Sequence, residues 1–146
     1  VLMLFTDHYC KYFSDAEFIS AIKGVTDHNM LMNVPFMIWT EGITPQVYDK
    51  YVSIMDIAPT VVDLFSLDAD LRYYIGSDMF GHDGGVVYFR DYAWYDGETY
   101  DPGNGTTSNP AVLDMRRQVR EQVDVSQDTF RCDYFAYLKR RGLSHP

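Results

Sequence analysis

The chain opens on five consecutive apolar residues, Val1 to Phe5, which run directly into Thr6, Asp7 and His8. A short unbroken apolar run is typical of a strand buried on both faces inside an α/β sheet. Ligand sites in such sheets lie just beyond the carboxyl ends of the strands. An aspartate and a histidine there offer one oxygen and one nitrogen ligand to a metal ion. Asp7 and His8 are therefore candidates for a metal site.

The same pair has a purely structural alternative. A Thr-Asp-His turn after a strand can simply satisfy backbone groups, and two adjacent residues leave a metal shell incomplete, since further protein ligands are needed. His28 and His82 each lie beside an aspartate in a polar stretch, and we expect them to be solvated rather than functional. His145, at the end of the chain, is not a candidate.

Composition excludes several classes of function. The 146 residues are 47% hydrophobic and 16% aromatic, which suits one domain with a sizeable core. The net charge of −9 disfavours binding to nucleic acid and to anionic lipid. No run approaches the roughly eighteen apolar residues of a membrane helix. The two cysteines, Cys10 and Cys132, fit either two free thiols or one disulfide.

The start of the chain also has a bearing on function. Its first residue is Val1, with no signal-type segment before the apolar run. A protein that begins on a central strand lacks neighbours for that strand, so we expect a piece of a longer protein. A piece of this kind exposes sheet edges and apolar surface, which makes a homo-oligomer of the fragment possible. If the rest of the active site lies elsewhere, this piece alone is inactive.

The first half of the chain alternates strand and helix signals. Residues 34–39 form a second apolar run with Pro35 at its start, where a missing N–H is tolerated. A helix capped by Ser14 or Asp15 and ended by Gly24 presents the apolar residues Phe18, Ile19 and Ile22. Asp56 caps a second helix whose predicted core stripe is Ile57, Val61, Leu64 and Phe65. This order predicts α/β units in a parallel sheet.

The second half predicts a small antiparallel sheet with covering helices. Strands are expected over 86–90 and 92–95, and Asp96-Gly97 is a two-residue hairpin signal. A Gly/Thr/Asn/Pro loop over 101–109, expected to be mobile, precedes a helix over 111–123 with an inner side of Val112, Met115, Val119 and Val123. Ser126 is predicted to cap a last helix whose inward residues are Phe130, Tyr134, Tyr137 and Leu138. We predict one domain over 1–146, with an α/β part (1–80) and a sheet-and-helix part (81–146).

Two further features leave alternatives open. The tyrosine-rich segment 88–100 could stack on sugars, but cross-strand packing is the preferred interpretation. Arg90 could meet a phosphate or pair with an acid. The chain has no phosphate-binding glycine loop, no Gly-x-Ser-x-Gly elbow and no Cys-x-x-Cys.

Several segments together resemble a known family. Phe5 to Tyr9, 34–39 and 52–65 resemble the C-terminal part of the sulfatase branch of the alkaline phosphatase superfamily. Residues 76–80 and 86–90 look like the lipoteichoic acid synthase group within that branch. The resemblance implies a partial α/β/α sandwich whose large sheet continues into a missing N-terminal part. Many relatives have glycine where this chain has Cys10, and often a further histidine soon after, which 11–15 does not offer.

The resemblance also implies a chemistry. Members of this group transfer glycerol phosphate from phosphatidylglycerol through a covalent intermediate on a threonine, at one divalent metal. Manganese is the expected metal, with calcium or magnesium as alternatives. A glutamate, the threonine and an Asp-His pair hold it; the pair corresponds to Asp7 and His8. The glutamate and threonine would lie upstream, and Thr6 is not that nucleophile.

Three functions follow from these expectations. The first is the C-terminal fragment of a phosphoglycerol transferase on the extracellular face of the bacterial cell membrane, acting on a phosphatidylglycerol-type lipid and a glycerol phosphate polymer. The second is a sulfate-ester hydrolase with calcium and a formylglycine. The third is a catalytically inactive sulfatase-like interaction domain. The nucleophile in the missing part would discriminate the first two.

Overall fold

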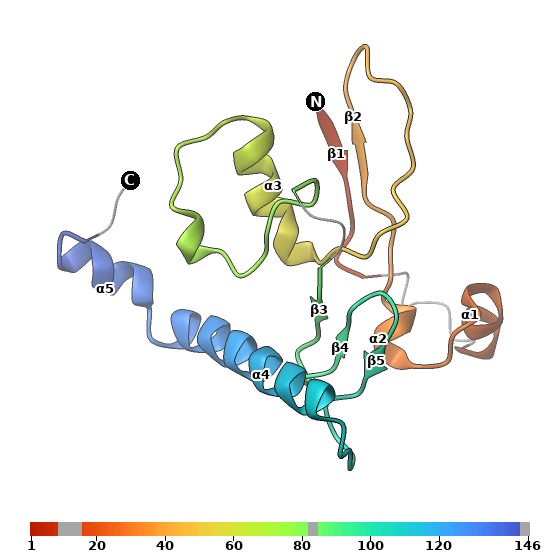
Figure 1. Ribbon diagram of the computed structural model, residues 1–146. Helices are drawn as coiled ribbons and strands as arrows, with labels where there is room; N and C mark the ends of the chain where they lie inside the picture. Colours follow the sequence, from red (N-terminus) through yellow and green to blue (C-terminus); the bar gives the residue numbers. More distant parts are fainter. Residues whose placement is uncertain (9–15, 82–84, 144–146) are drawn as a thin grey trace. The chain divides into compact units, whose positions relative to one another are not determined.

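The computed structural model describes residues 1–8, 16–81 and 85–143 as a mixture of helices and short antiparallel sheets (Figure 1). The chain divides into two compact units, Val1–Tyr48 and Asp49–Pro146. In the described part of the chain, no helix combines the length and the apolar character that crossing a bilayer requires. The predicted mixture of α and β structure is confirmed at this level.

The first unit is built on a two-stranded ladder. Strand β1 (Leu2–Leu4) pairs antiparallel with β2 (Met37–Trp39), and Leu4 lies opposite Met37. The predicted parallel arrangement is therefore wrong for these two strands. A parallel partner requires the intervening chain to cross back to the start of β1. Here the intervening chain returns beside the end of β1, so β2 runs in the opposite direction.

The side chains of this ladder are largely exposed. Leu2 and Leu4 are 49% and 47% exposed, and Trp39 is 61% exposed. The predicted strand at the start of the chain is confirmed, but its predicted burial on both faces is wrong. Such burial needs a covering layer on each face of a sheet, and the helices of this unit leave these side chains open.

Two helices lie between the strands in sequence. Helix α1 (Ala16–Lys23) ends at Gly24, whose φ of +68° suits a glycine beyond a helix end. The predicted caps Ser14 and Asp15 lie outside the described residues, and Phe18 and Ile22 of the predicted apolar face are exposed. The sequence prediction missed α2 (His28–Leu31), which begins where the Asp27 carboxylate accepts hydrogen bonds from two backbone N–H groups. The Lys23 ammonium donates hydrogen bonds to the carbonyls of Leu31, the last residue of α2, and of Asn33.

The second unit begins with a 3₁₀ turn, η1 (Ile54–Asp56), that runs into α3 (Ile57–Leu64). The predicted helix is confirmed, but its predicted core stripe is wrong, because Leu64 and Phe65 are 45% and 48% exposed. The buried residues of α3 are Pro59 and Thr60. That side of the helix binds the backbone of residues 77–79, which no periodicity within α3 could indicate. A second 3₁₀ turn, η2 (Leu71–Tyr73), follows.

A three-stranded antiparallel sheet forms the middle of this unit. Strands β3 (Val87–Tyr88), β4 (Trp94–Tyr95) and β5 (Tyr100–Asp101) pair in sequence order. Tyr95 lies opposite Tyr100, which leaves Gly97 and Glu98 as the turn. The φ of +101° at Gly97 shows why a glycine stands there. The predicted hairpin is confirmed.

Helix α4 (Pro110–Arg131) covers this sheet, and α5 (Tyr134–Arg140) follows it. Buried Trp94 of β4 packs with Val119 and Val123 of α4, and Val112 and Met115 lie against this cluster. The predicted inner side of the helix is therefore confirmed.

The predicted helix start at Ser126 is wrong, because α4 continues through it and serine is tolerated within a long helix. The break falls instead at Cys132 and Asp133, where Asp133 has a φ of +49°. Of the four residues predicted to face inward, Leu138 is buried, and Phe130, Tyr134 and Tyr137 are exposed. The break after Arg131 separates Phe130 from the other three residues, since one helical period cannot be carried through a left-handed residue.

Arg116 of α4 holds the loop that was expected to be mobile. Its guanidinium donates two hydrogen bonds of 2.9 Å to the Asp101 carboxylate, and others to the carbonyls of Asn104 and Gly105. Both side chains of the pair are mostly buried. This bidentate pair fastens the start of the loop to the helix.

The Asp101–Arg116 pair makes stability depend on pH. Hydrogen bonds from Arg116 lower the pKa of the Asp101 carboxyl below its ordinary value. A lowered pKa in the folded state stabilises the fold above the unfolded pKa of about 3.9, and the contribution disappears as the pH falls through the folded pKa. We expect Asp101→Asn to lower the urea midpoint at neutral pH and to have little further effect near pH 2. Asp128→Asn, at an exposed pair with Arg131, is the control and should change neither midpoint.

Candidate functional site

Asp7 and His8 form a turn directly after β1. Their side chains point to a common place, with His8 Nε2 3.5 Å from Asp7 Oδ2. The Asp7 side chain is 76% exposed and that of His8 37% exposed. The pair is thus accessible to solvent at the end of a strand, where the sequence predicted a site.

The geometry of the pair is compatible with a shared cation. Two ligand atoms that each lie about 2.1 Å from one ion are separated by roughly 3.0–3.4 Å at octahedral or tetrahedral angles. The observed 3.5 Å is close to this separation and long for a direct hydrogen bond. An anionic oxygen and an imidazole nitrogen are also a donor set that transition metals accept. The residues present therefore fit one side of a metal shell.

Thr6 supports this turn. Its hydroxyl donates a hydrogen bond of 2.8 Å to the His8 carbonyl. A hydroxyl whose proton is held by the backbone next to it fixes the turn that presents Asp7 and His8.

No further metal ligands gather around the pair in the described residues. Across 1–8, 16–81 and 85–143, no group of three or more His, Cys, Asp or Glu side chains could hold an ion. His28 is exposed at the start of α2, while His82 and His145 lie outside the described residues. Asp7 and His8 alone would leave a metal shell incomplete.

A second polar cluster centres on Asp56 in the other unit. Asp56 is 7% exposed, and its carboxylate accepts hydrogen bonds from the N–H groups of Ser53, at 2.7 Å, and Ser77, at 2.9 Å. Fully buried Thr60 donates to the Asp56 carbonyl and accepts from Met79 N–H at 2.9 Å. These bonds tie residues 77–79 to η1 and α3, which makes the cluster a structural clamp.

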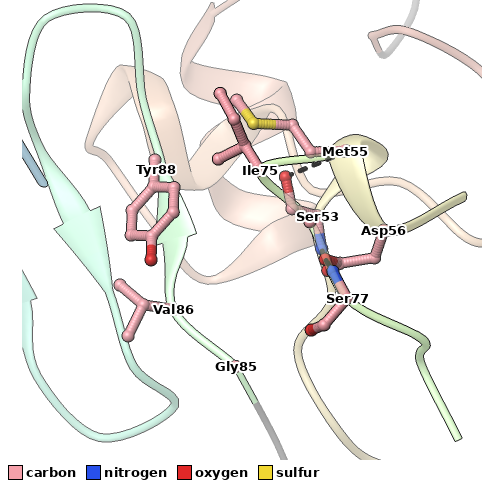
Figure 2. A pocket seen from close by; sticks show the side chains of 9 residues that line it. Ser53, Met55, Asp56, Ile75, Ser77, Gly85, Val86 and Tyr88 are labelled. Atoms are coloured by element: carbon pink, nitrogen blue, oxygen red, sulfur yellow. Dashed lines mark hydrogen bonds between the residues drawn. The ribbon is translucent and has the colours of Figure 1, made fainter. Parts of the chain in front are cut away.

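A cavity of about 50 Å³ lies beside this clamp, between Asp56, Ser77, Val86 and Tyr88 (Figure 2). This volume holds only a few water molecules, so a substrate such as glycerol phosphate does not fit. Burial, and then the charge of Asp56, raise the pKa of the Tyr88 phenol above its ordinary value. Tyr88 therefore stays neutral at physiological pH and offers no phenolate for catalysis.

The sequence prediction recognised Asp56 only as a helix cap. The structure places it at that position, but its side chain makes no capping bond to α3 and serves the clamp instead. The spacing Ser53-x-x-Asp56 is a capping-box signal that could have revealed the local half of this arrangement. The bond to Ser77, 21 residues away, has no local signal.

The aromatic segment packs on itself, as the preferred interpretation expected. The Phe89 and Tyr100 rings meet edge to face at 6.3 Å, and those of Tyr51 and Tyr95 at 4.5 Å. Arg90 is exposed and forms no ion pair with a described residue. Cys132 is exposed, while Cys10 lies outside the described residues.

Comparison with known proteins finds similar sequences. The model of the Sulfatase family matches residues 1–67, which contain Asp7, His8 and the Asp56–Thr60 part of the clamp. Lipoteichoic acid synthase 2 of Bacillus subtilis (strain 168) is 22% identical, with 98% of this chain aligned. Lipoteichoic acid synthase of Staphylococcus aureus (strain USA300) is 26% identical, with 95% aligned. Residues 1–67 are thus similar to the Sulfatase family, and nearly the whole chain is similar to these lipoteichoic acid synthases.

The chain spans 24% of the length of these curated relatives. No solved structure matches it significantly. The family match begins at residue 1, includes β1 and the Asp7–His8 turn that follows it, and extends through α3. The match to the Sulfatase model therefore covers the Asp7–His8 pair and the Asp56–Thr60 part of the clamp, and the alignments to lipoteichoic acid synthases extend over nearly the whole chain.

Proposed function

We propose that this chain is the C-terminal part of a metal-dependent phosphoglycerol transferase of the lipoteichoic acid synthase type. The observation that carries this proposal is the alignment of 95–98% of the chain with proteins named lipoteichoic acid synthase. The exposed Asp7–His8 pair at the end of β1 supports it, because such an enzyme needs a metal ligand pair open to substrate. The proposed fold is an α/β/α sandwich completed by the remainder of a longer enzyme, as one catalytic domain.

In this proposal Asp7 and His8 hold one side of a divalent cation. The Asp7 carboxylate supplies negative charge and His8 a neutral imidazole nitrogen. The nitrogen ligand favours manganese over calcium and magnesium, which prefer shells made of oxygen. When bound, the cation would stabilise negative charge on phosphoryl oxygens and on an attacking hydroxyl. Thr6 keeps the two ligands oriented through its bond to the His8 carbonyl.

The proposed donor is a phosphatidylglycerol-type lipid, and the proposed acceptor is a glycerol phosphate polymer outside the bacterial cell membrane. Transfer of glycerol phosphate out of the lipid forms one phosphorus–oxygen bond, breaks another and leaves diacylglycerol. A sulfate-ester hydrolase is a second candidate, because the matching family model is that of the sulfatases. The two reactions release different products and can be separated by assay.

The test uses the longer natural protein that contains this chain. We expect manganese-dependent release of diacylglycerol from phosphatidylglycerol vesicles, and no release of sulfate from an aryl sulfate ester. Sulfate release without lipid cleavage would establish the hydrolase instead. An absence of both products, in a folded and manganese-loaded protein, would make the chain part of an inactive interaction domain.

A further inference from the structure

The C-terminal helix α5 and the residue after it carry a positive, aromatic surface on an acidic protein. We call the exposed residues Tyr134, Tyr137, Lys139, Arg140 and Arg141 the basic–aromatic surface. No acidic residue occurs between 134 and 143, although the chain as a whole has a net charge of −9. Three of the chain's twelve Lys and Arg residues thus follow one another at 139–141, and the nearest acidic residue in the sequence is Asp133.

The aromatic residues of this surface are arranged as a stripe. The rings of Tyr134 and Tyr137 are stacked, with centroids 6.4 Å apart and planes at 22°. The Arg141 guanidinium lies over the Tyr137 ring at 5.6 Å. Tyr134 and Tyr137 are 39% and 43% exposed, so the stripe faces solvent. Tyrosine and arginine side chains with an apolar body and a polar tip suit the boundary between water and lipid.

The opposite side of α5 is anchored, which fixes the direction of the basic–aromatic surface. Leu138 is buried, and the Phe135 ring meets the Tyr73 ring of η2 at 5.9 Å, nearly edge to face. The helix thus has one side held by the unit and another left open. In the described residues, Lys139, Arg140 and Arg141 form no ion pair with an acidic side chain.

We propose that the basic–aromatic surface docks on the headgroups of an anionic lipid bilayer. Each basic side chain near an anionic membrane raises the binding constant about fivefold. The tyrosine side chains would enter the interfacial layer of the bilayer. The net charge of the whole chain does not prevent this contact. Charges more than a Debye length of about 10 Å away are largely screened at ordinary ionic strength, so the local charge decides.

The experiment measures sedimentation of the 146-residue chain with vesicles of phosphatidylcholine, with and without added phosphatidylglycerol. We expect binding only with phosphatidylglycerol present. Lys139→Gln/Arg140→Gln should weaken it about thirtyfold, and Arg90→Gln/Arg117→Gln, which removes the same charge elsewhere on exposed residues, should leave it unchanged. Circular dichroism of both double variants confirms the fold, because none of these four side chains is buried.

Equal binding to both vesicle types, no binding to either, or an equal loss in the two double variants would overturn the proposal. So would binding to a soluble glycerol phosphate polymer through Lys139 and Arg140 without binding to vesicles, since the surface would then recognise a polymer. The assay contains no metal and measures no turnover. Its failure is therefore distinguishable from failure of the proposed transferase activity.

Discussion

Gly76→Ala should destabilise the second unit by about 3 kcal/mol or more. A Cβ at this position would lie 2.2 Å from the Met55 carbonyl oxygen and 2.7 Å from the Asp56 nitrogen. Both are backbone atoms, so no side-chain rotation relieves the overlap. The backbone must separate at the point where Ser77 and Met79 bind the clamp.

The predicted cost has two parts. Separation stretches the bond from Ser77 N–H to the Asp56 carboxylate, at 2.9 Å, and the equally long bond from Met79 N–H to Thr60. Because Asp56 and Thr60 are buried, a lost partner leaves a polar group desolvated, which costs roughly 1–3 kcal/mol for each group. Overpacking of the backbone adds a similar amount.

Urea and thermal unfolding, followed by circular dichroism, measure this effect. For a chain of this size, about 3 kcal/mol corresponds to a fall in Tm of roughly 10 °C. Gly81→Ala is the matched control, because its Cβ would first meet the movable end of the Asp78 side chain, at 3.0 Å. Equal stability of the two variants would show that Gly76 is not held against η1.

Local signals in the sequence predicted several elements correctly. Gly24 ends α1, Gly97 lies in the turn of the β4–β5 hairpin, and the spacing of Val119 and Val123 identified the buried side of α4. Each of these features depends on a few neighbouring residues, whose propensities and turn preferences act without long-range help. The structures that these local patterns predict therefore occur in the folded chain.

Features set by distant contacts were not predictable. The antiparallel pairing of β1 and β2 depends on how the intervening chain returns, and the buried side of α3 depends on residues 77–79. Apolar runs cannot show which of their faces will be covered, and Leu4 and Phe65 remain open as a result. For the site, the sequence predicted that Asp7 and His8 act as a pair, and the structure brings their side chains together. Their role as metal ligands stays a prediction.

In the longer enzyme, Asp7→Ala should lower the transfer rate by at least about a thousandfold. The change removes an anionic ligand and leaves His8 as the single donor from this turn. Manganese titration by calorimetry should show a weaker site, and the 146-residue chain on its own should bind manganese weakly, because two ligands make an incomplete shell. The fold should persist, since the Asp7 side chain is 76% exposed.

Asp68→Ala is the control for this prediction, because Asp68 is another exposed aspartate and lies away from a strand end. It removes the same charge and should leave both turnover and manganese affinity unchanged. Loss of activity in both variants would indicate an effect of net charge rather than of ligation. Full activity and full manganese affinity in Asp7→Ala would remove Asp7 from the site. The turn made by Thr6, Asp7 and His8 would then have a purely structural role. The hydrogen bond from the Thr6 hydroxyl to the His8 carbonyl supports such a role.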